Sequence, residues 1–340
     1  MGGACGQHEA AWYEREANSF VRCRLCPHEC HIGPDRRGKC LGRVNYDGTL
    51  YAETYARPAS IAMDPIEKKP LYHFAPGGQI LSIGTYGCNL RCKFCQNCEI
   101  SFQRTPTESL GIEELVTAAK ARESIGIAFT YNEPVIWFEF VKDCAAACRT
   151  AGLSTVMVTN GFINPEPLEE LLPLIDAMNI DLKSFRPEFY RDVCGGALEP
   201  VKATLKRAVK SCHVEITNLI IPGHNDGARE CSDMAEWIAA ELGAEVPFHL
   251  SAYSPRHQFQ ARPTSAADLA AIKPLFDKHL KYVYLGNIAI PGAADTVCPA
   301  CHETAVRRVG YSVDPAGMTK DGRCAACKQT LGMHGLRNGQ

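Results

Sequence analysis

The sequence predicts an α/β protein with one large parallel sheet and a small cysteine-rich module at each end. Three observations support this fold class. From residue 80 onward, short apolar, β-branched segments alternate with amphipathic ones, which is the pattern of parallel strands joined by crossover helices. The length of 340 residues is enough for one large core with small appendages. Twelve of the 18 cysteines form three tight groups, and two of these groups lie outside the alternating region.

The alternating region contains seven expected strands and six expected helices. The strands are residues 80–85, 127–132, 154–160, 177–183, 213–221, 247–253 and 281–287. The helices are residues 111–124, 135–150, 167–174, 198–211, 228–241 and 265–280. About six strand–helix units predict an open doubly wound sheet or a partial barrel. In both folds the reacting groups lie at the carboxyl ends of the strands.

The chain divides into three expected parts: a cysteine-rich segment (1–75), the alternating domain (76–290) and a C-terminal module (291–340). The charges are balanced, with 36 basic and 38 acidic residues, so no overall field favours nucleic acid or a membrane surface. The start of the chain, MGGACGQHEA, lacks the basic and apolar regions of a signal peptide. We therefore expect a cytoplasmic protein with no membrane or nucleic-acid partner, whose clustered cysteines bind metals instead of forming disulfides.

The stretch GTYGCNLRCKFCQNCEIS follows the first expected strand and offers two overlapping ligand patterns. Cys92, Cys95 and Cys98 match the start of a ferredoxin run, which needs a fourth thiolate soon afterwards. The next cysteine lies much further on, inside an expected helix. Cys88, Cys92 and Cys95 instead form C-x3-C-x2-C, which leaves one iron of a cluster without a protein ligand. We favour this second pattern, because it lies where an active site is expected.

Polar residues also follow the other expected strands, so they should gather at the same rim. They are Asn132 and Glu133 after the second strand, Asn160 after the third, Asp181 and Lys183 on the fourth, the segment 221–226 after the fifth, and His249 and Tyr253 on the sixth. This arrangement is typical of an active site, and a simple electron carrier would not need it.

Several motifs in this order resemble the radical S-adenosylmethionine superfamily and its glycyl-radical activases. They are GTYGCNLRCKFCQN, TYNEP (130–134), VTNGF (158–162), NIDLK (179–183) and IPGHND (221–226). CRLCPHECHIGPDRRGKC, DPIEKKPLYHF (64–74) and two C-terminal C-x2-C knuckles resemble the radical enzyme of the AmmeMemoRadiSam group. The resemblance covers nearly the whole chain. It implies a partial (β/α)6 barrel whose [4Fe–4S] cluster cleaves S-adenosylmethionine to a 5′-deoxyadenosyl radical, which abstracts hydrogen from a substrate that the sequence does not name.

The resemblance also implies roles for individual residues. Cys88, Cys92 and Cys95 would bind the cluster. The expected contacts to S-adenosylmethionine are Phe94 near the adenine, Tyr131 and Asn132 beside Glu133 at the amino group, and Asn160, Asp181 and Lys183 at the ribose and carboxylate. No residue is identified as catalytic, and the candidates are Cys194, His249 and Tyr253.

Two positions depart from the family pattern. Cys98 stands where the family commonly has an aromatic residue, and we expect it to be a small apolar filler. Thr217 stands where activases of the pyruvate formate-lyase type usually have arginine, which weakens the case for glycyl-radical generation.

The two terminal cysteine groups are further metal candidates. The N-terminal group could hold zinc or an auxiliary iron–sulfur cluster, with zinc favoured and His28 and His31 as substitute ligands; it consists of Cys23, Cys26, Cys30 and Cys40. The C-terminal group has the paired knuckles of a zinc ribbon or rubredoxin, which predicts a structural zinc site; it consists of Cys298, Cys301, Cys324 and Cys327.

The main functional hypothesis is an oxygen-sensitive radical enzyme that needs an electron donor such as flavodoxin or ferredoxin. The resemblance also implies association with Memo-like and AMMECR-like proteins. One alternative is an activase that places a glycyl radical on a partner enzyme. The other is a non-catalytic iron–sulfur or zinc protein used in electron transfer or regulation.

Overall fold

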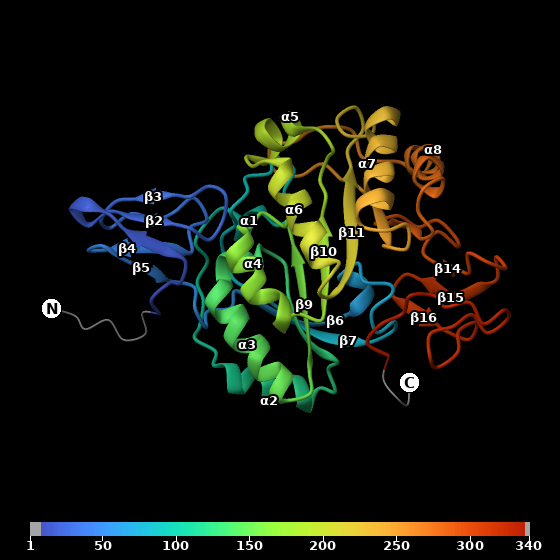
Figure 1. Ribbon diagram of the computed structural model, residues 1–340, viewed down its shortest axis with the longest axis horizontal. Coiled ribbons are helices and arrows are strands. Elements are labelled where there is room, and N and C mark those ends of the chain that lie inside the picture. Colours follow the sequence, from blue (N-terminus) through green and yellow to red (C-terminus); the bar gives the residue numbers. More distant parts are fainter. Residues whose placement is uncertain (1–7, 337–340) are drawn as a thin grey trace.

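The computed structural model describes residues 8–336. Residues 1–7 and 337–340, the extreme ends of the two predicted terminal modules, lie outside the described residues, and the expectation of no signal peptide rests partly on them. Figure 1 shows a central sheet with its helices, a group of short strands at the N-terminal side and a small red module at the C-terminal side.

The central sheet has eight strands in the order β13-β12-β11-β10-β9-β8-β7-β6. All pairs are parallel except β6 and β7, which are antiparallel. The strands are β6 (Ser60–Pro65), β7 (Gln79–Gly84), β8 (Gly126–Phe129), β9 (Ser154–Thr159), β10 (Ala177–Asp181), β11 (His213–Ile220), β12 (Phe248–Ala252) and β13 (Val283–Gly286). All seven predicted strands are therefore present.

The order of the strands decides between the two predicted architectures. From β7 to β13 each strand lies beside the next one in sequence, whereas a doubly wound sheet reverses its order at a switch point. The doubly wound alternative is therefore wrong. The order is linear from β6 to β13, so within residues 8–336 the sheet is a partial barrel that does not close.

Two details differ from the sequence prediction. Strand β6 was not predicted, because Ser60–Pro65 precedes the alternating region and mixes polar with apolar residues. The central sheet therefore begins ahead of the boundary drawn at residue 76. Strand β8 ends at Phe129 instead of residue 132, because the chain turns away at Tyr131, whose φ of 72° is incompatible with a strand.

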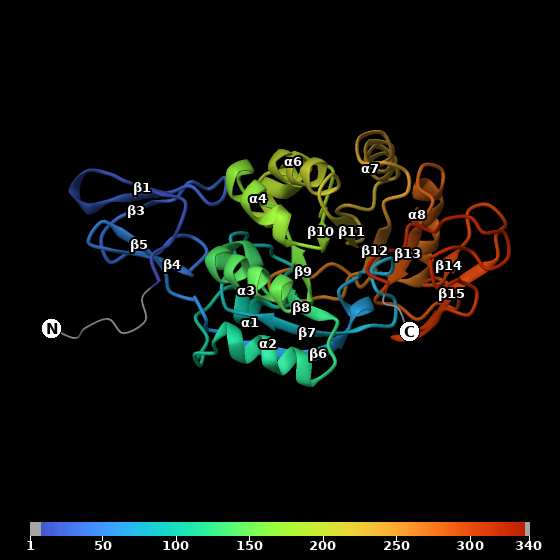
Figure 2. The same ribbon diagram turned by 60° about the horizontal axis from the view of Figure 1, so that its bottom comes forward.

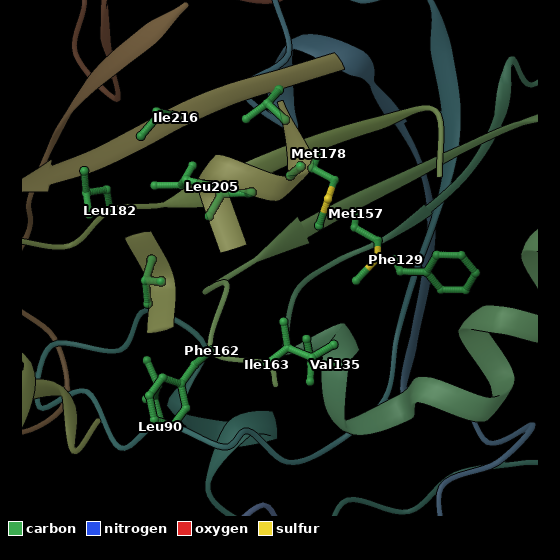
Figure 3. Packing of buried hydrophobic residues seen from close by; sticks show 14 of the residues in the cluster. Leu90, Phe129, Val135, Met157, Phe162, Ile163, Met178, Leu182, Leu205 and Ile216 are labelled. Carbon is green, nitrogen blue, oxygen red and sulfur yellow. The ribbon is translucent and has the colours of Figure 1, made fainter. Parts of the chain in front are cut away.

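Helices follow the strands as crossovers and cover the outer face of the sheet (Figures 1 and 2). They are α2 (Ile112–Ala121), α3 (Phe138–Thr150), α4 (Pro165–Leu171), α6 (Leu198–Ala208), α7 (Ala228–Glu241) and α8 (Ala266–Asp277), together with the short α1 (Cys98–Ser101) and α5 (Pro187–Phe189). Figure 3 shows Met157, Met178 and Ile216, from neighbouring strands, in one apolar cluster with Leu205 of α6. All four side chains are at most 2% exposed, and this apolar burial is the main stabilising contribution to the domain. None of the described helices is long and apolar enough to cross a membrane.

A second buried region, inside the sheet, is polar. The Glu215 carboxylate, 0% exposed, lies 2.7 Å from His249 Nε2 and 3.0 Å from His213 Nε2 and accepts a hydrogen bond of 2.7 Å from the His73 backbone. Burial alone would raise the pKa of Glu215, but hydrogen bonds from His213 and His249 outweigh it and hold the pKa well below its ordinary value. The His73 ring continues the network to Tyr284 Oη, at 2.6 Å.

This network also fixes the C-terminal module, which contains β14 (Thr296–Val297), β15 (Thr304–Val309) and β16 (Ser312–Asp314). The Tyr284 hydroxyl lies 2.9 Å from Thr296 Oγ1, and His73 Nδ1 lies 2.9 Å from the Leu331 carbonyl oxygen. The segment 64–74, noted in the sequence as a motif, therefore joins the sheet to this module.

The N-terminal segment forms a small sheet and a hairpin. The sheet consists of β1 (Tyr13–Arg15), β2 (Val21–Cys23) and β3 (His31–Ile32), and the hairpin of β4 (Arg43–Tyr46) and β5 (Thr49–Ala52). Arg43 connects the hairpin to α3 through a buried ion pair, with its Nη2 2.8 Å from Glu139 Oε1. The segment is therefore packed against the sheet domain.

Candidate active site

A cavity of about 420 Å³ opens at the carboxyl ends of the strands. The three cysteines of the favoured pattern and all seven residues expected to contact S-adenosylmethionine line it. The lining includes Cys88, Cys92, Cys95, Phe94, Tyr131, Asn132, Glu133, Asn160, Asp181 and Lys183. Residues that are far apart in the sequence are thus brought together as the strand-end argument predicts.

The loop that carries the three cysteines is anchored by apolar packing and by backbone hydrogen bonds. Leu90 is 1% exposed and lies beside Phe162 in the apolar core (Figure 3). The Arg91 and Lys93 backbone N–H groups donate to the carbonyl oxygens of Cys194 and Val193, at 2.8 and 3.0 Å. This anchoring presents the thiols to the cavity. Three thiolates at one wall of a polar cavity fit an iron–sulfur cluster with one iron left for another ligand.

Cys98 is not among the residues that line the cavity. It begins helix α1, and its side chain is half-buried. The structure therefore places Cys88, Cys92 and Cys95 at the cavity and Cys98 outside its lining.

Asn132 and Asn160 hold the cysteine loop. The Asn132 side chain accepts from the Thr85 backbone at 3.0 Å and donates to the Gly87 carbonyl at 2.9 Å. The Asn160 amide donates to Asn89 Oδ1 at 2.9 Å, and its nitrogen lies 3.7 Å from Cys88 Sγ. Both residues line the cavity, but their amides already have partners in the protein. Their geometry is that of positioning residues.

Glu133 is the buried carboxylate of the site. It begins a helical turn whose first residue is Pro134, and it caps this turn by accepting from the Val135 backbone at 3.0 Å. It also accepts from Thr159 Oγ1 at 2.6 Å and from the Asn160 backbone at 2.8 Å. Burial raises the pKa of Glu133 to about 7, against the lowering effect of these hydrogen bonds.

Asp181 and Lys183 form the charged pair of the site. They lie two residues apart at the end of β10, so they share one face, and Lys183 Nζ is 2.8 Å from Asp181 Oδ2. Burial would lower the pKa of Lys183, but the negative charges of Asp181 and the neighbouring thiols hold it well above its ordinary value. Lys183 Nζ also lies 5.9 Å from the centre of the Phe94 ring. Lys183 therefore stays protonated, with its positive charge beside an aromatic face.

Tyr131 adopts a left-handed backbone conformation, which is strained for a side chain of this size. Two hydrogen bonds of 2.6 Å hold it: its hydroxyl donates to Asp64, and its carbonyl accepts from Asn97. Asp64 also pairs with Lys68 and Lys69, each at 2.7 Å. Lys68 and Lys69 both line the cavity. They were not among the predicted site residues, although they belong to the 64–74 motif.

The three candidate catalytic residues do not line the cavity. His249 belongs to the buried network around Glu215, and the Tyr253 hydroxyl donates to the Phe259 carbonyl at 2.7 Å. Cys194 is fully buried, and its thiol is a hydrogen-bond partner of Cys92 that lowers the pKa of Cys92. Of these three, Cys194 is the one whose side chain interacts with a predicted cluster ligand.

Ser251 and Thr217 line the cavity and were not predicted to do so. Ser251 follows His249 by two residues on β12. Alternation along the strand therefore indicates that both side chains point to the same face of the sheet, but not which of them lies nearer the cavity. The Thr217 hydroxyl is buried and has no hydrogen-bond partner among the described residues.

The C-terminal cysteines form a compact four-sulfur site. All four ligand atoms lie within 4.8 Å of one another, and two sulfur pairs, Cys298–Cys327 and Cys301–Cys324, are 3.5 and 3.6 Å apart. Tetrahedral zinc with Zn–S bonds of about 2.3 Å separates its sulfurs by about 3.8 Å. The geometry thus fits one closed zinc ion.

We expect the double variant Cys298→Ser/Cys327→Ser to lose one zinc per chain and to melt several degrees below the wild type, because a closed site adds its binding free energy to folding. Metal analysis and differential scanning calorimetry measure both effects. Cys231→Ser, a buried thiol outside the group, is the control and should keep the zinc. Unchanged zinc content in the double variant would contradict the assignment.

Comparisons with known proteins add to this geometry. The Radical SAM superfamily model matches residues 82–238. An uncharacterized protein of Methanocaldococcus jannaschii is 38% identical over 330 residues, which cover 95% of this chain and 98% of the relative. Pyruvate formate-lyase 1-activating enzyme of Escherichia coli is 30% identical over 179 residues, 48% of this chain and 71% of the enzyme. A radical SAM methyltransferase from Sphaerobacter thermophilus shares the fold, with a TM-score of 0.50 and 15% identity over 62% of this chain and 66% of that chain.

Proposed function

The chain belongs to the radical SAM superfamily, and on that premise we propose that it is an enzyme that cleaves S-adenosylmethionine and abstracts hydrogen from a substrate. One observation carries the proposal. The thiols of Cys88, Cys92 and Cys95 share a single cavity with a buried carboxylate, a charged pair and a buried phenyl ring. When bound, a [4Fe–4S] cluster would supply the electron that splits the cofactor into methionine and a 5′-deoxyadenosyl radical.

The chain's own residues would bind and orient the cofactor. The Glu133 carboxylate is fixed by three donors and is placed to accept a further hydrogen bond, from the cofactor's amino group. Lys183 supplies positive charge for the cofactor's carboxylate, and Asp181 is an acceptor for the ribose hydroxyls. Phe94, 4% exposed, offers an aromatic face to the adenine. A cofactor held at both ends in this way has its sulfonium bond oriented before the reaction begins.

The reaction itself is the test of this proposal. Anaerobically reconstituted protein, given dithionite and S-adenosylmethionine, should release 5′-deoxyadenosine, which chromatography quantifies. A non-catalytic iron–sulfur or zinc protein would leave the cofactor intact. Absence of the nucleoside from a preparation with a fully loaded and reducible cluster would overturn the proposed function.

The pKa of Glu133, about 7, predicts a pH dependence of cofactor binding. The carboxylate that accepts from the amino group forms as pH rises through the pKa, so affinity for S-adenosylmethionine should rise about tenfold from pH 6 to pH 8. Anaerobic calorimetric titration measures this. The Glu133→Gln variant should bind more weakly at pH 8 and lose the Glu133-dependent part of the slope, whereas Glu113→Gln on the exposed side of α2 should behave as wild type. An identical slope in Glu133→Gln would contradict this role.

A second candidate function is activation of a glycyl-radical enzyme. The similarity to pyruvate formate-lyase 1-activating enzyme over 48% of this chain favours it. Thr217, which lines the cavity where those activases usually have arginine, is the feature against it. An activase would produce a glycyl-radical doublet in the electron paramagnetic resonance spectrum of a partner protein, in addition to 5′-deoxyadenosine.

The proposal includes partners. A low-potential donor of the flavodoxin or ferredoxin type would supply the electron, because the cluster must be reduced before each cleavage. The resemblance to the AmmeMemoRadiSam group adds Memo-like and AMMECR-like proteins as associates. Co-purification of the anaerobic protein with each of these classes tests the proposed associations.

A further inference from the structure

The N-terminal cysteines form a second buried site, separate from the candidate active site. Three of them, Cys23, Cys26 and Cys40, are at most 9% exposed. All four line one small cavity, whose other walls combine apolar and polar side chains. The apolar ones are Leu25, Ile32 and Ile136, and the polar ones are His28, Lys39, Arg43 and Asn89. Four thiols around one cavity, in a chain with no described disulfide, are a ligand set for a metal centre.

The spacing of these thiols distinguishes them from the C-terminal group. Among residues 8–336, the C-terminal cysteines are the one group whose ligand atoms are close enough to hold a single ion. The N-terminal four line a common cavity without approaching one another that closely. The three cysteines of the active site show the same wider spacing. A [4Fe–4S] cluster requires this, because each of its four thiolates binds a different iron, whereas all four ligands of a zinc ion meet at one point.

The N-terminal site contains a buried positive charge, which suits a negatively charged ligand. Arg43 is 1% exposed and lines the cavity. Its Nη1 and Nη2 are paired with Ala11 and Glu139, but its buried Nε has no hydrogen-bond partner among the described residues. A buried N–H donor without a partner costs free energy unless a ligand accepts from it. Thiolate and sulfide sulfurs of a metal centre are such acceptors.

Backbone N–H groups also lie near the sulfurs. Burial raises the pKa of the Cys23, Cys26 and Cys40 thiols, and the N–H groups of Leu25 and His28 (for Cys23 and Cys26) and of Gly42 and Arg43 (for Cys40) act in the opposite direction. Hydrogen bonds of this kind stabilise thiolates, and in iron–sulfur proteins they tune the reduction potential.

The two histidines that could replace a thiol in a mixed zinc site have other partners in the protein. His28 Nε2 lies 2.7 Å from the Asn89 carbonyl oxygen, and its Nδ1 lies 3.4 Å from Lys39 Nζ. His31 Nε2 lies 2.6 Å from Glu16, and its ring stacks on Phe20. The ligand set is therefore four sulfurs.

We propose that Cys23, Cys26, Cys30 and Cys40 hold an iron–sulfur cluster, in place of the zinc favoured from the sequence alone. Four thiolates complete its coordination, so this cluster has no open iron. Its role is then to accept and release one electron as its irons change valence, with no bond formed or broken in a substrate. The assignment does not depend on the proposed function, because it concerns a separate cavity.

The N-terminal site adjoins the loop that carries the active-site cysteines. A Cβ atom at Gly87, whose φ is +96°, would lie 2.2 Å from the Cys40 carbonyl oxygen, so glycine alone allows this contact. Asn89 lines the N-terminal cavity and accepts from Asn160 of the active site at 2.9 Å. Cys88 lies between these two residues. The proposed cluster is thus directly behind the active-site cysteines.

The test uses the full chain with the active-site ligands removed, as Cys88→Ser/Cys92→Ser/Cys95→Ser. This variant is reconstituted anaerobically with iron, sulfide and an equal amount of zinc, and metals and acid-labile sulfide are measured per chain. We expect about four irons with matching sulfide, as in a [4Fe–4S] cluster, one zinc, and an electron paramagnetic resonance signal after dithionite reduction. Adding Cys23→Ser/Cys26→Ser should remove the iron and the signal, and the single zinc should report that the C-terminal module remains folded.

Cys212→Ser, a half-buried thiol outside all three groups, is the matched control on the same background and should keep the iron. Two zincs and no iron in the triple variant would overturn the assignment in favour of zinc. Absence of both metals from the N-terminal site, with one zinc retained, would overturn it as well. If the wild type fails to form 5′-deoxyadenosine while the triple variant keeps its iron, the proposed function fails and this inference stands.

Discussion

The Cys92→Ala variant should lose the iron of the active-site cluster and release 5′-deoxyadenosine no faster than a protein-free control. Cys92 is 7% exposed and is the middle of the three thiols at the cavity. With two thiolates left, a cluster is held by too few ligands to survive at this wall. Iron analysis, the visible absorption spectrum and chromatographic assay of the nucleoside measure the effect.

Cys98→Ala is the matched control. Cys98 belongs to the same loop but lies outside the cavity lining, so this variant should keep both the cluster and the reaction. If Cys98→Ala removed the cluster and Cys92→Ala did not, the ligand set would be the ferredoxin pattern, and the assignment of the open iron would be wrong.

The largest expected effect on stability comes from Glu215→Ala. This change removes the acceptor of three hydrogen bonds and leaves the donors of His73, His213 and His249 buried without it. Breaking a fully buried ionic network costs about 3–5 kcal/mol in the free energy of unfolding. Chemical denaturation followed by circular dichroism, with metal content matched between variants, measures the loss.

Glu199→Ala is the control. Its side chain is exposed on the first turn of α6, so this variant should change the unfolding free energy by less than about 0.5 kcal/mol.

The same network predicts how stability depends on pH. Because the pKa of Glu215 is held below its ordinary value, the contribution of Glu215 to the unfolding free energy is present above the unfolded-state pKa and is lost as pH falls through the folded-state pKa. The wild type should therefore lose stability in acid more steeply than Glu215→Ala. Parallel acid profiles of the two proteins would be incompatible with this account.

Much of the fold follows from local patterns in the sequence. The seven parallel strands are short, apolar and regularly spaced, and each one except the last is followed by a helical segment, so both periodicities are visible without long-range information. Strand β6 has no such pattern. It pairs with β7 at the edge of the sheet, and an edge strand of mixed composition is specified by its neighbour more than by its own residues.

The sequence predicted the site residues that directly follow the parallel strands, because the carboxyl ends of such strands meet at one edge of the sheet. Strand ends meet at one rim, and this brought Glu133, Asn160 and Asp181 to the same cavity. Depth along a strand was not predictable. His249 and Ser251 share a face of β12, yet His249 pairs with Glu215 in the interior and Ser251 lines the cavity. The stagger between neighbouring strands decides which of the two reaches the rim, and a sequence does not display it.

The sequence also did not separate residues that could bind a cofactor from those that hold the loop. Asn132 and Glu133 are adjacent and equally polar. Both ends of the Asn132 amide are used within the protein, whereas Glu133 has the geometry to accept one more donor. This distinction depends on which partners the fold supplies, and only the contacts reveal it.

The close approach of Gly87 to the Cys40 carbonyl oxygen links the N-terminal cysteine segment to the loop that carries Cys88. A displacement of the Cys40 backbone would therefore move the wall that supports this loop. Oxidation of the N-terminal thiols in air is then expected to loosen the active-site loop, even when Cys88 has not itself been attacked.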